Sequence, residues 1–340
     1  MLYLTHDAGK EFLAKTLTDL FMDTEKIYDE ALRLWSSTPL GDIQSACRAC
    51  MKPDDKNLLL LGDNLSMMAA ISHQIGAGIR APINLIYMDP PYFSNRDPES
   101  RIKVKTNSGE TYVKAQAFSD TWVRQGGSAS RGEALMDYLA MLTPRIVAAR
   151  ELLTDDGALW LHLDRRAVHY AKVMTDVVFG GPDNMINEII WFYKSGGSSS
   201  KRFANKHDTL LFYVKKKRKY KFYPQEEKSY NRGLKPYRFK GVKEYRDDHG
   251  WYTVVNMKDV WEIPMVGRTA AERTGYATQK PEALLERLVL SCTEKGDTCL
   301  DPFGGSGTLA AVCAKYGRNW ISIDNSPAAI ETTENRLKNV

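Results

Sequence analysis

Residues 297–317 read DTCLDPFGGSGTLAAVCAKYG, and this stretch indicates the fold class. The apolar run at 297–303 predicts a buried strand, and the glycines after it lead directly into a run with helical spacing. Because glycine has no Cβ atom, a ligand can approach the backbone of such a turn closely. Gly305, Gly307 and Ala310 satisfy the G-x-G-x-x-A variant of the dinucleotide pattern, which alone fits a tight strand–helix turn equally well.

Strands and helices alternate along most of the remaining chain. Apolar runs predict further strands at 57–63, 83–89, 157–164, 188–193, 209–214 and 319–324. Helical spacing predicts helices from 66, at 133–153, 165–179 and 282–293, and after 326. This interleaving indicates an α/β fold with a mostly parallel sheet. The first fifty residues also show helical spacing, but they carry no catalytic motif.

The composition excludes several classes of protein. Of 340 residues, 43% are hydrophobic and 26% are charged, values typical of a soluble globular chain. Apolar runs are too short for a transmembrane span, and the N-terminal residues do not resemble a secretory signal. Five cysteines are too few for a disulfide scaffold, and no cluster of metal ligands is evident. We therefore expect a cytoplasmic protein without a metal.

The charge distribution is strongly uneven. Residues 194–258 carry 18 Lys and Arg against 6 Asp and Glu, whereas the whole chain has a formal net charge of only +5. The rest of the chain is therefore acidic. Twelve aromatic residues are interspersed among these basic ones. This pattern favours a polyanionic partner, with nucleic acid as the leading candidate.

A second motif follows the apolar run at 83–89. Asp89-Pro90-Pro91-Tyr92 stands where the carboxyl end of a parallel strand is expected, which is the ligand-binding edge of an open α/β sheet. The prolines stiffen the loop and lack N–H donors, but their carbonyls can still accept. Acceptors beside the flat ring of Tyr92 suit a planar group that bears an amino donor, such as adenine or cytosine.

Together, these motifs resemble the S-adenosylmethionine-dependent DNA amino-methyltransferases, which methylate an exocyclic nitrogen of adenine or cytosine. The catalytic motif precedes the glycine-rich loop, an order similar to that of the β class of this family. The resemblance runs from about 57 to the C-terminus and also covers LGDNL (61–65) and TQKP (278–281). It implies a Rossmann-like methyltransferase fold with a circularly rearranged motif order and a basic target-recognition insert.

The resemblance also implies a binding site for the cofactor S-adenosylmethionine. Asp63 would contact the adenine of the cofactor, Asp324 its ribose hydroxyls, and Thr278 and Lys280 its methionine carboxylate. The full set of expected cofactor residues is Asp63, Thr278, Lys280, Asp301, Phe303, Gly304, Gly305, Ser306, Gly307, Thr308 and Asp324.

The resemblance further implies a catalytic role for Asp89, Pro90, Pro91 and Tyr92. The Asp89 carboxylate and the Pro90 carbonyl would accept the two hydrogens of the amino group and localise its lone pair. The carboxylate would stabilise the positive charge that develops on nitrogen, while Tyr92 stacks on the base. The target nucleotide must leave the duplex to reach such a site.

The predicted organisation has four parts: a helical arm at 1–56, a catalytic half at 57–193, a basic target-recognition region at 194–275 and a cofactor-binding half at 276–340. The first strand of the basic region, about 208–214, is assigned to the core. The predicted DNA contacts are Lys215, Lys216, Lys217, Arg218 and Lys219. The alternative for such a run is a solvated charged loop.

The leading hypothesis is adenine-N6 methylation of double-stranded DNA, because an aspartate in the first position is the usual form for adenine in this family. Alternatives are cytosine N4, RNA or a protein amide as acceptor, an NAD-dependent oxidoreductase, and an inactive DNA-binding subunit. The expected partners are double-stranded DNA, a cognate restriction endonuclease and a second copy of the chain, without a membrane and with a nucleoid location.

Overall fold

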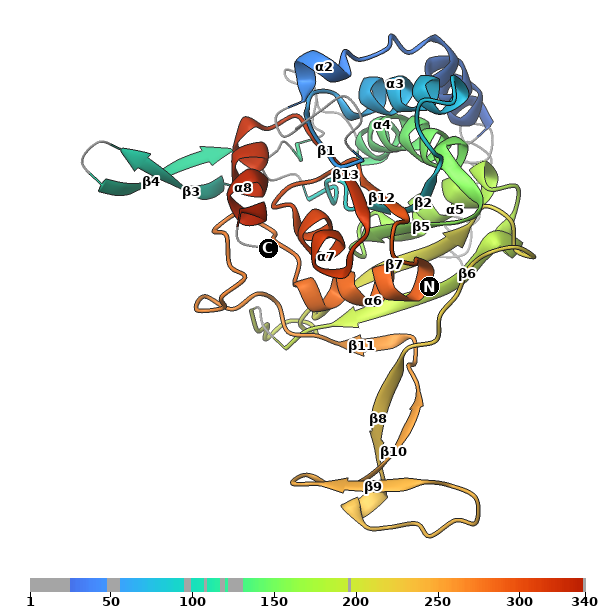
Figure 1. Ribbon diagram of the computed structural model, residues 1–340, viewed down its shortest axis with the longest axis vertical. Coiled ribbons are helices and arrows are strands. Elements are labelled where there is room, and N and C mark those ends of the chain that lie inside the picture. The colour runs from blue at the N-terminus through green and yellow to red at the C-terminus, as the bar shows by residue number, and fades with distance from the viewer. Residues whose placement is uncertain are drawn as a thin grey trace, which may run out of the picture.

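An eight-stranded sheet forms the centre of the computed structural model, which describes residues 25–47, 56–94, 99–106, 109–116, 120–121, 131–194 and 197–338 (Figure 1). The strand order is β1 (Leu58–Leu61), β13 (Asn319–Asp324), β12 (Thr298–Asp301), β2 (Ile83–Met88), β5 (Leu153–Leu163), β7 (His207–Val214), β6 (Met185–Phe192) and β11 (Val260–Glu262). Among these strands β7 alone runs antiparallel to its neighbours. The predicted mostly parallel α/β sheet is thus confirmed.

The central strands are buried on both faces, which explains their continuous apolar sequences. Successive residues of a strand point to opposite faces, so Leu58 and Leu60 join one core cluster and Leu59 joins the other. The helices α3 (Asn64–Gly76), α4 (Arg131–Leu152) and α5 (Val168–Val178) contribute to the first cluster. The helices α6 (Glu282–Cys292), α7 (Thr308–Tyr316) and α8 (Pro327–Leu337) contribute to the second.

Strand β12 lies beside β2, although about two hundred residues separate them in the chain. Cys299 pairs with Leu85 and Leu300 with Ile86, in parallel register. Parallel strands end at the same edge, so the loop after Met88 and the loop after Asp301 meet there. The register therefore brings the two sequence motifs together.

The described part of the N-terminal segment packs on the body. A helix covers 25–37, and α2 (Ile43–Ala46) follows it. Ile27 and Ala31 are buried in the first core cluster. Cys47 forms a bridge to Leu60 of β1. The described part of the segment thus contains two helices, at 25–37 and 43–46, with a non-helical stretch between them.

The predicted target-recognition region is divided by the fold. Strands β7 and β11 of this region belong to the main sheet, β7 as the sequence predicts, whereas β8 (Glu226–Tyr230), β10 (Gly250–Asn256) and β9 (Glu244–Asp247) form a separate antiparallel sheet. This sheet, with η2 (Arg232–Leu234), projects away from the body in Figure 1. We call residues 226–256 the projecting sheet. Only this part of 194–275 forms a structural unit of its own.

Two smaller elements were not predicted. The strands β3 (Glu99–Thr106) and β4 (Gly109–Gln116) pair antiparallel as a hairpin that extends from the body (Figure 1). A 3₁₀ turn, η1 (Pro182–Asn184), connects α5 to β6. Over the described ranges, each helix is too short or too polar to cross a membrane.

Asp301 ends β12 inside the molecule. Its side chain is 4% exposed, and one carboxyl oxygen accepts the Phe303 N–H at 2.9 Å. Burial raises the pKa of Asp301 well above its usual range, and the charges of Asp89 and Asp324 add to this, although the Phe303 N–H opposes it. A carboxyl group whose pKa is raised by folding favours the folded state when protonated, and this contribution is lost as pH rises through the raised pKa.

We therefore predict that Asp301→Asn raises the free energy of unfolding at pH 8 and that the gain disappears near pH 4. The amide cannot ionise, and each unit of pKa difference is worth about 1.4 kcal/mol. Urea unfolding at both pH values measures the effect. The control is Asp183→Asn, at a side chain that is 93% exposed, which should shift the urea midpoint little at either pH. A gain that does not vary with pH would contradict the prediction.

Candidate active site

A cavity of about 490 Å³ opens at the carboxyl ends of β1, β13, β12 and β2. Both sequence motifs line it, together with residues from the loops before α3 and α6. The lining includes Asp63, Asn64, Tyr87, Asp89, Pro90, Pro91, Tyr92, Asp120, Arg145, Tyr276, Thr278, Lys280, Asp301, Phe303, Gly304, Gly305, Ser306, Thr308 and Asp324. The predicted catalytic and cofactor residues thus line one cavity, except for Gly307, which packs against Thr333.

The Asp89 carboxylate is held by two side chains. The Tyr92 hydroxyl donates to Oδ1 at 2.6 Å, and the Lys280 ammonium donates to Oδ2. Burial, followed by the charge of Asp89, raises the pKa of Tyr92 well above its ordinary value. Tyr92 therefore stays protonated and donates. The Lys280 ammonium also lies 5.1 Å from the centre of the Tyr92 ring, so it contacts the catalytic loop, whereas the sequence predicts a contact with the cofactor.

Beneath Asp89 lies His162 of β5, which is fully buried. Its Nδ1 is 2.8 Å from the Tyr87 hydroxyl and 3.8 Å from Asp89 Oδ1. Its Nε2 is 3.6 Å from Asp208 Oδ2 on β7. Burial alone would raise the pKa of Asp208, but its interaction with the nearby His162 and the charge of Lys280 hold it below its ordinary value. His162 thus lies between the loop after β2 and strand β7.

Two glycines of the turn are closely packed. A Cβ atom on Gly304 would lie 2.2 Å from the Ser322 hydroxyl, which would have to rotate away, and 3.3 Å from the Ile323 carbonyl. Gly307 has a φ of +71°, and a Cβ there would meet Thr333 at 2.5 Å. The close packing lets β12, β13 and α8 approach each other and keeps the turn open toward the cavity. This cradle fits a cofactor that contacts backbone.

Asp324 stands at the end of β13 beside this turn. One carboxyl oxygen accepts the Gly305 N–H and the other the Ser326 N–H, each at 2.8 Å. Burial raises the pKa of Asp324, although these two hydrogen bonds oppose the shift. The carboxylate of Asp324, at the cavity wall, is an acceptor suited to vicinal hydroxyls. The residues present therefore fit a nucleoside with a ribose.

Three residues that tie the cavity wall together were missed or left without a role. The Asn64 amide donates to the Pro302 carbonyl at 2.8 Å. Arg145 of α4 donates to Asn64 at 2.6 Å and to Asp63 at 3.3 Å. Asp120, which is buried, accepts the Ser94 N–H at 2.7 Å. One sign of this role was visible in the sequence, because Arg145 is a charged residue within the apolar run of α4. It did not indicate that Asn64 and Asp63 are the partners of Arg145.

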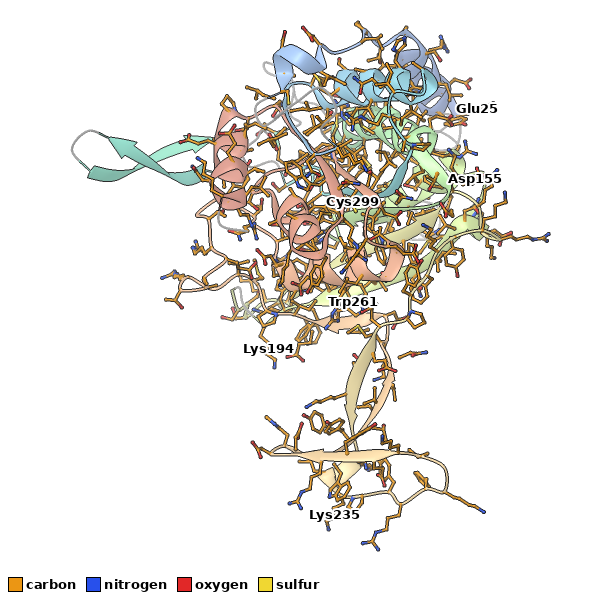
Figure 2. All side chains as sticks on the ribbon, viewed as in Figure 1. Glu25, Asp155, Lys194, Lys235, Trp261 and Cys299 are labelled. Carbon is orange, nitrogen blue, oxygen red and sulfur yellow. The ribbon has the colours of Figure 1, made fainter. Side chains whose placement is uncertain are left out.

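The predicted DNA contacts do not lie at this site. Because β7 is antiparallel, its C-terminal end and the run 215–219 lie at the amino edge of the parallel strands, away from Asp89. Lys216 and Lys219 pair with Asp155 at 2.7 and 3.4 Å, and Lys217 pairs with Asp183 at 3.5 Å. Figure 2 shows Asp155 and Lys194, which follows the carboxyl end of β6, on opposite sides of the body.

Lys215 is also engaged by the body. Its ammonium donates to the Leu153 carbonyl at 2.6 Å, and burial lowers its pKa. Arg218 is exposed at the same edge. Lys216, Lys217 and Lys219 are paired with aspartates, and the whole run lies at the edge opposite the cavity. DNA contact by Lys215, Lys216, Lys217, Arg218 and Lys219 therefore stays an untested prediction that this geometry does not favour.

Comparison with known proteins gives the family. The family model described as DNA methylase, of the N6 and N4 methyltransferases, matches residues 83–335, which is well over half of the chain. Type II methyltransferase M.HpaI of Haemophilus parainfluenzae is 27% identical over 256 residues, covering 75% of this chain and 68% of its own. M.ScaI of Streptomyces caespitosus is 24% identical over 323 residues, covering 88% of each chain.

Solved structures share the fold. A complex of M1.HpyAVI with SAM covers 82% of this chain and 98% of its own, with a TM-score of 0.50 and 18% identity. PvuII DNA methyltransferase, which is cytosine-N4-specific, covers 82% of this chain and 86% of its own, with a TM-score of 0.51 and 14% identity. With the two motifs in one cavity and the family model across both, the chain belongs to the N6/N4 family of DNA methylases.

Proposed function

We propose that the protein transfers a methyl group from S-adenosylmethionine to the N6 atom of an adenine that has been flipped out of double-stranded DNA. One observation carries the proposal: Asp89, Pro90 and Tyr92 line the same cavity as the glycine turn and Asp324. The loop that can accept hydrogen bonds from an amino group and the glycine turn that can hold a nucleoside thus line the same cavity.

S-adenosylmethionine is the cofactor of this enzyme, and it supplies an activated methyl group on sulfur. We assign its ribose to Asp324 and its adenine to the wall formed by Asp63 and Phe303. Gly304 and Gly305 let the cofactor approach the turn closely. These assignments rest on the cavity and its donors and acceptors.

The catalytic loop orients the amino nitrogen. Asp89 Oδ2 and the Pro90 carbonyl accept its two hydrogens, which leaves the lone pair free to point at the methyl group. The carboxylate would stabilise the positive charge on nitrogen as the methyl–nitrogen bond forms and the methyl–sulfur bond breaks, and the nitrogen would then lose one proton to water. A base that reaches Asp89 takes the place of the Lys280 ammonium, which now bonds that oxygen. Lys280 is thereby released toward the methionine carboxylate, close to where the sequence predicts it.

The tip of the projecting sheet is the better candidate for DNA contact. Arg232, Lys235, Arg238, Lys240 and Lys243 are exposed, without an acidic residue in the intervening sequence. Within the described part of the chain, none of these five side chains has an ion-pair partner. Aromatic residues flank them, and Tyr237 lies 5.3 Å from Phe239 between ring centres. Figure 2 places Lys235 at the far end of the projection.

The proposal also covers the cellular role of the protein. Type II methyltransferases are among the relatives, so we propose that the chain modifies a specific short sequence alongside a cognate restriction endonuclease in the cytoplasm. Association with the nucleoid would follow from DNA binding. The homodimer stays a prediction, since one chain does not test it.

We predict that Asp89→Asn lowers kcat by about 10²-fold to 10³-fold, the usual cost of removing one group that stabilises the transition state electrostatically. The Kd for S-adenosylmethionine, measured by calorimetry, should stay within a few-fold. The expected product is N6-methyladenine at one short motif in genomic DNA of cells that express the wild type, detected by modified-base sequencing.

The matched control is Asp183→Asn, an exposed aspartate distant from the cavity, which should methylate like the wild type. Detection of N4-methylcytosine at the motif would show that cytosine, and not adenine, is the methylated base. Absence of both modified bases from DNA of wild-type cells would contradict the proposed acceptor.

We predict that replacing Lys235, Arg238 and Lys240 by Gln weakens DNA binding and flattens its salt dependence. Each lost phosphate contact removes roughly 0.9 from the slope of log Kobs against log salt concentration, so the slope should fall by up to about 2.7. The control is Lys216, Lys217 and Lys219→Gln, which removes the same charge at the opposite edge. Fluorescence anisotropy at several salt concentrations measures both. Equal effects of the two triple variants would contradict the assignment to the projecting sheet.

A further inference from the structure

Phe203 is the most exposed large apolar side chain in the described part of the chain, at 99%. Single exposed apolar residues are common at protein surfaces and need no explanation by themselves. The surroundings of Phe203 are unusual, because Lys201, Arg202 and Lys206 accompany it in the loop that joins β6 to β7. This arrangement combines an aromatic ring with charges that suit a nucleic acid.

The loop stands on a rigid base beside the catalytic layer. The Tyr193 N–H donates to the Lys206 carbonyl at 2.9 Å, and Phe192 pairs with His207 to close the β6–β7 ladder. The next residue, Asp208, reaches to 3.6 Å from His162, which in turn lies 3.8 Å from Asp89. The loop therefore starts at the edge of the sheet where the catalytic carboxylate lies.

Phe203 is within reach of a duplex held over the cavity. Four residues lie between it and Asp208, and the five Cα–Cα steps that this makes span at most about 17 Å.

Two cationic side chains of the loop can bind phosphate. Neither Lys201 nor Arg202 has an ion-pair partner among the residues that the structure describes, and both are exposed. By contrast, Lys216, Lys217 and Lys219 each pair with an aspartate. Two unpaired cations directly before a ring can hold backbone phosphates of the DNA while the ring enters the stack.

We propose that Phe203 is the wedge that fills the base stack when the target adenine leaves it, with Lys201 and Arg202 holding the flanking phosphates. The inference rests on the proposed function, because only a flipped base leaves such a gap. Flipping breaks stacking on both neighbours of the target. An inserted aromatic ring restores stacking to them and so lowers the free energy of the flipped state.

The test uses two versions of one duplex that carries the sequence found by genomic sequencing. In one the target adenine is paired with thymine, and in the other it lies opposite an abasic site, where flipping costs less. We predict that Phe203→Ala lowers the single-turnover rate roughly tenfold to hundredfold on the paired duplex, as loss of one stacked ring implies. On the abasic duplex the loss should be less than about threefold. Phe203→Trp should keep the wild-type rate on both.

The matched control is Phe222→Ala, the same chemical change at a half-exposed ring on the opposite edge, and it should behave like the wild type on both duplexes. The Kd of each variant for S-adenosylmethionine, by calorimetry, should equal that of the wild type. Equal losses on the two duplexes, or no loss on either, would overturn the wedge. A wild type that methylates neither duplex would instead refute the proposed function, and the wedge with it.

Discussion

Leu85 and Ile86 of β2 pair in parallel with Cys299 and Leu300 of β12, and the site depends on this register. The pairing places two loops from distant parts of the chain at one edge, one stiffened by prolines and one opened by glycines. A shift by one residue would turn the side chains of one strand to the opposite face of the sheet. Both strands are buried, so such a shift would be strongly unfavourable. Core packing therefore determines the spacing of the site.

The same edge brings three carboxyl groups together in the cavity. Asp89, Asp301 and Asp324 all line the cavity, and burial raises the pKa of the latter two. The Lys280 ammonium offsets part of this repulsion by bonding Asp89. A bound cofactor that carries a positively charged sulfur would offset more of it. The electrostatic environment of Asp89 therefore depends on whether the cofactor is bound beside the glycine turn.

Local patterns predicted the parts of the molecule whose structure is locally determined. The buried strands, the glycine turn and the loop Asp89–Tyr92 are each readable from a few adjacent residues. The position of the lysine run 215–219 was not readable, because it depends on β7 running antiparallel to β5. Likewise Arg145 acquires its role from Asn64, which only tertiary packing brings to it. The sequence indicated which side chains belong to the candidate site. The direction of the strands determined which of these side chains lie close together.

The projecting sheet enters and leaves the body at one point. The Met257 N–H donates to the Gln225 carbonyl at 2.8 Å, so the chain returns to where it left. An insertion whose ends already touch adds little strain to its host, and the entropy of closing it grows only slowly with length. Sheets of other lengths and sequences could therefore be exchanged at this junction over evolution. On the proposed role of the projecting sheet in DNA contact, the chemistry of methyl transfer and the choice of DNA sequence could then diverge at independent rates.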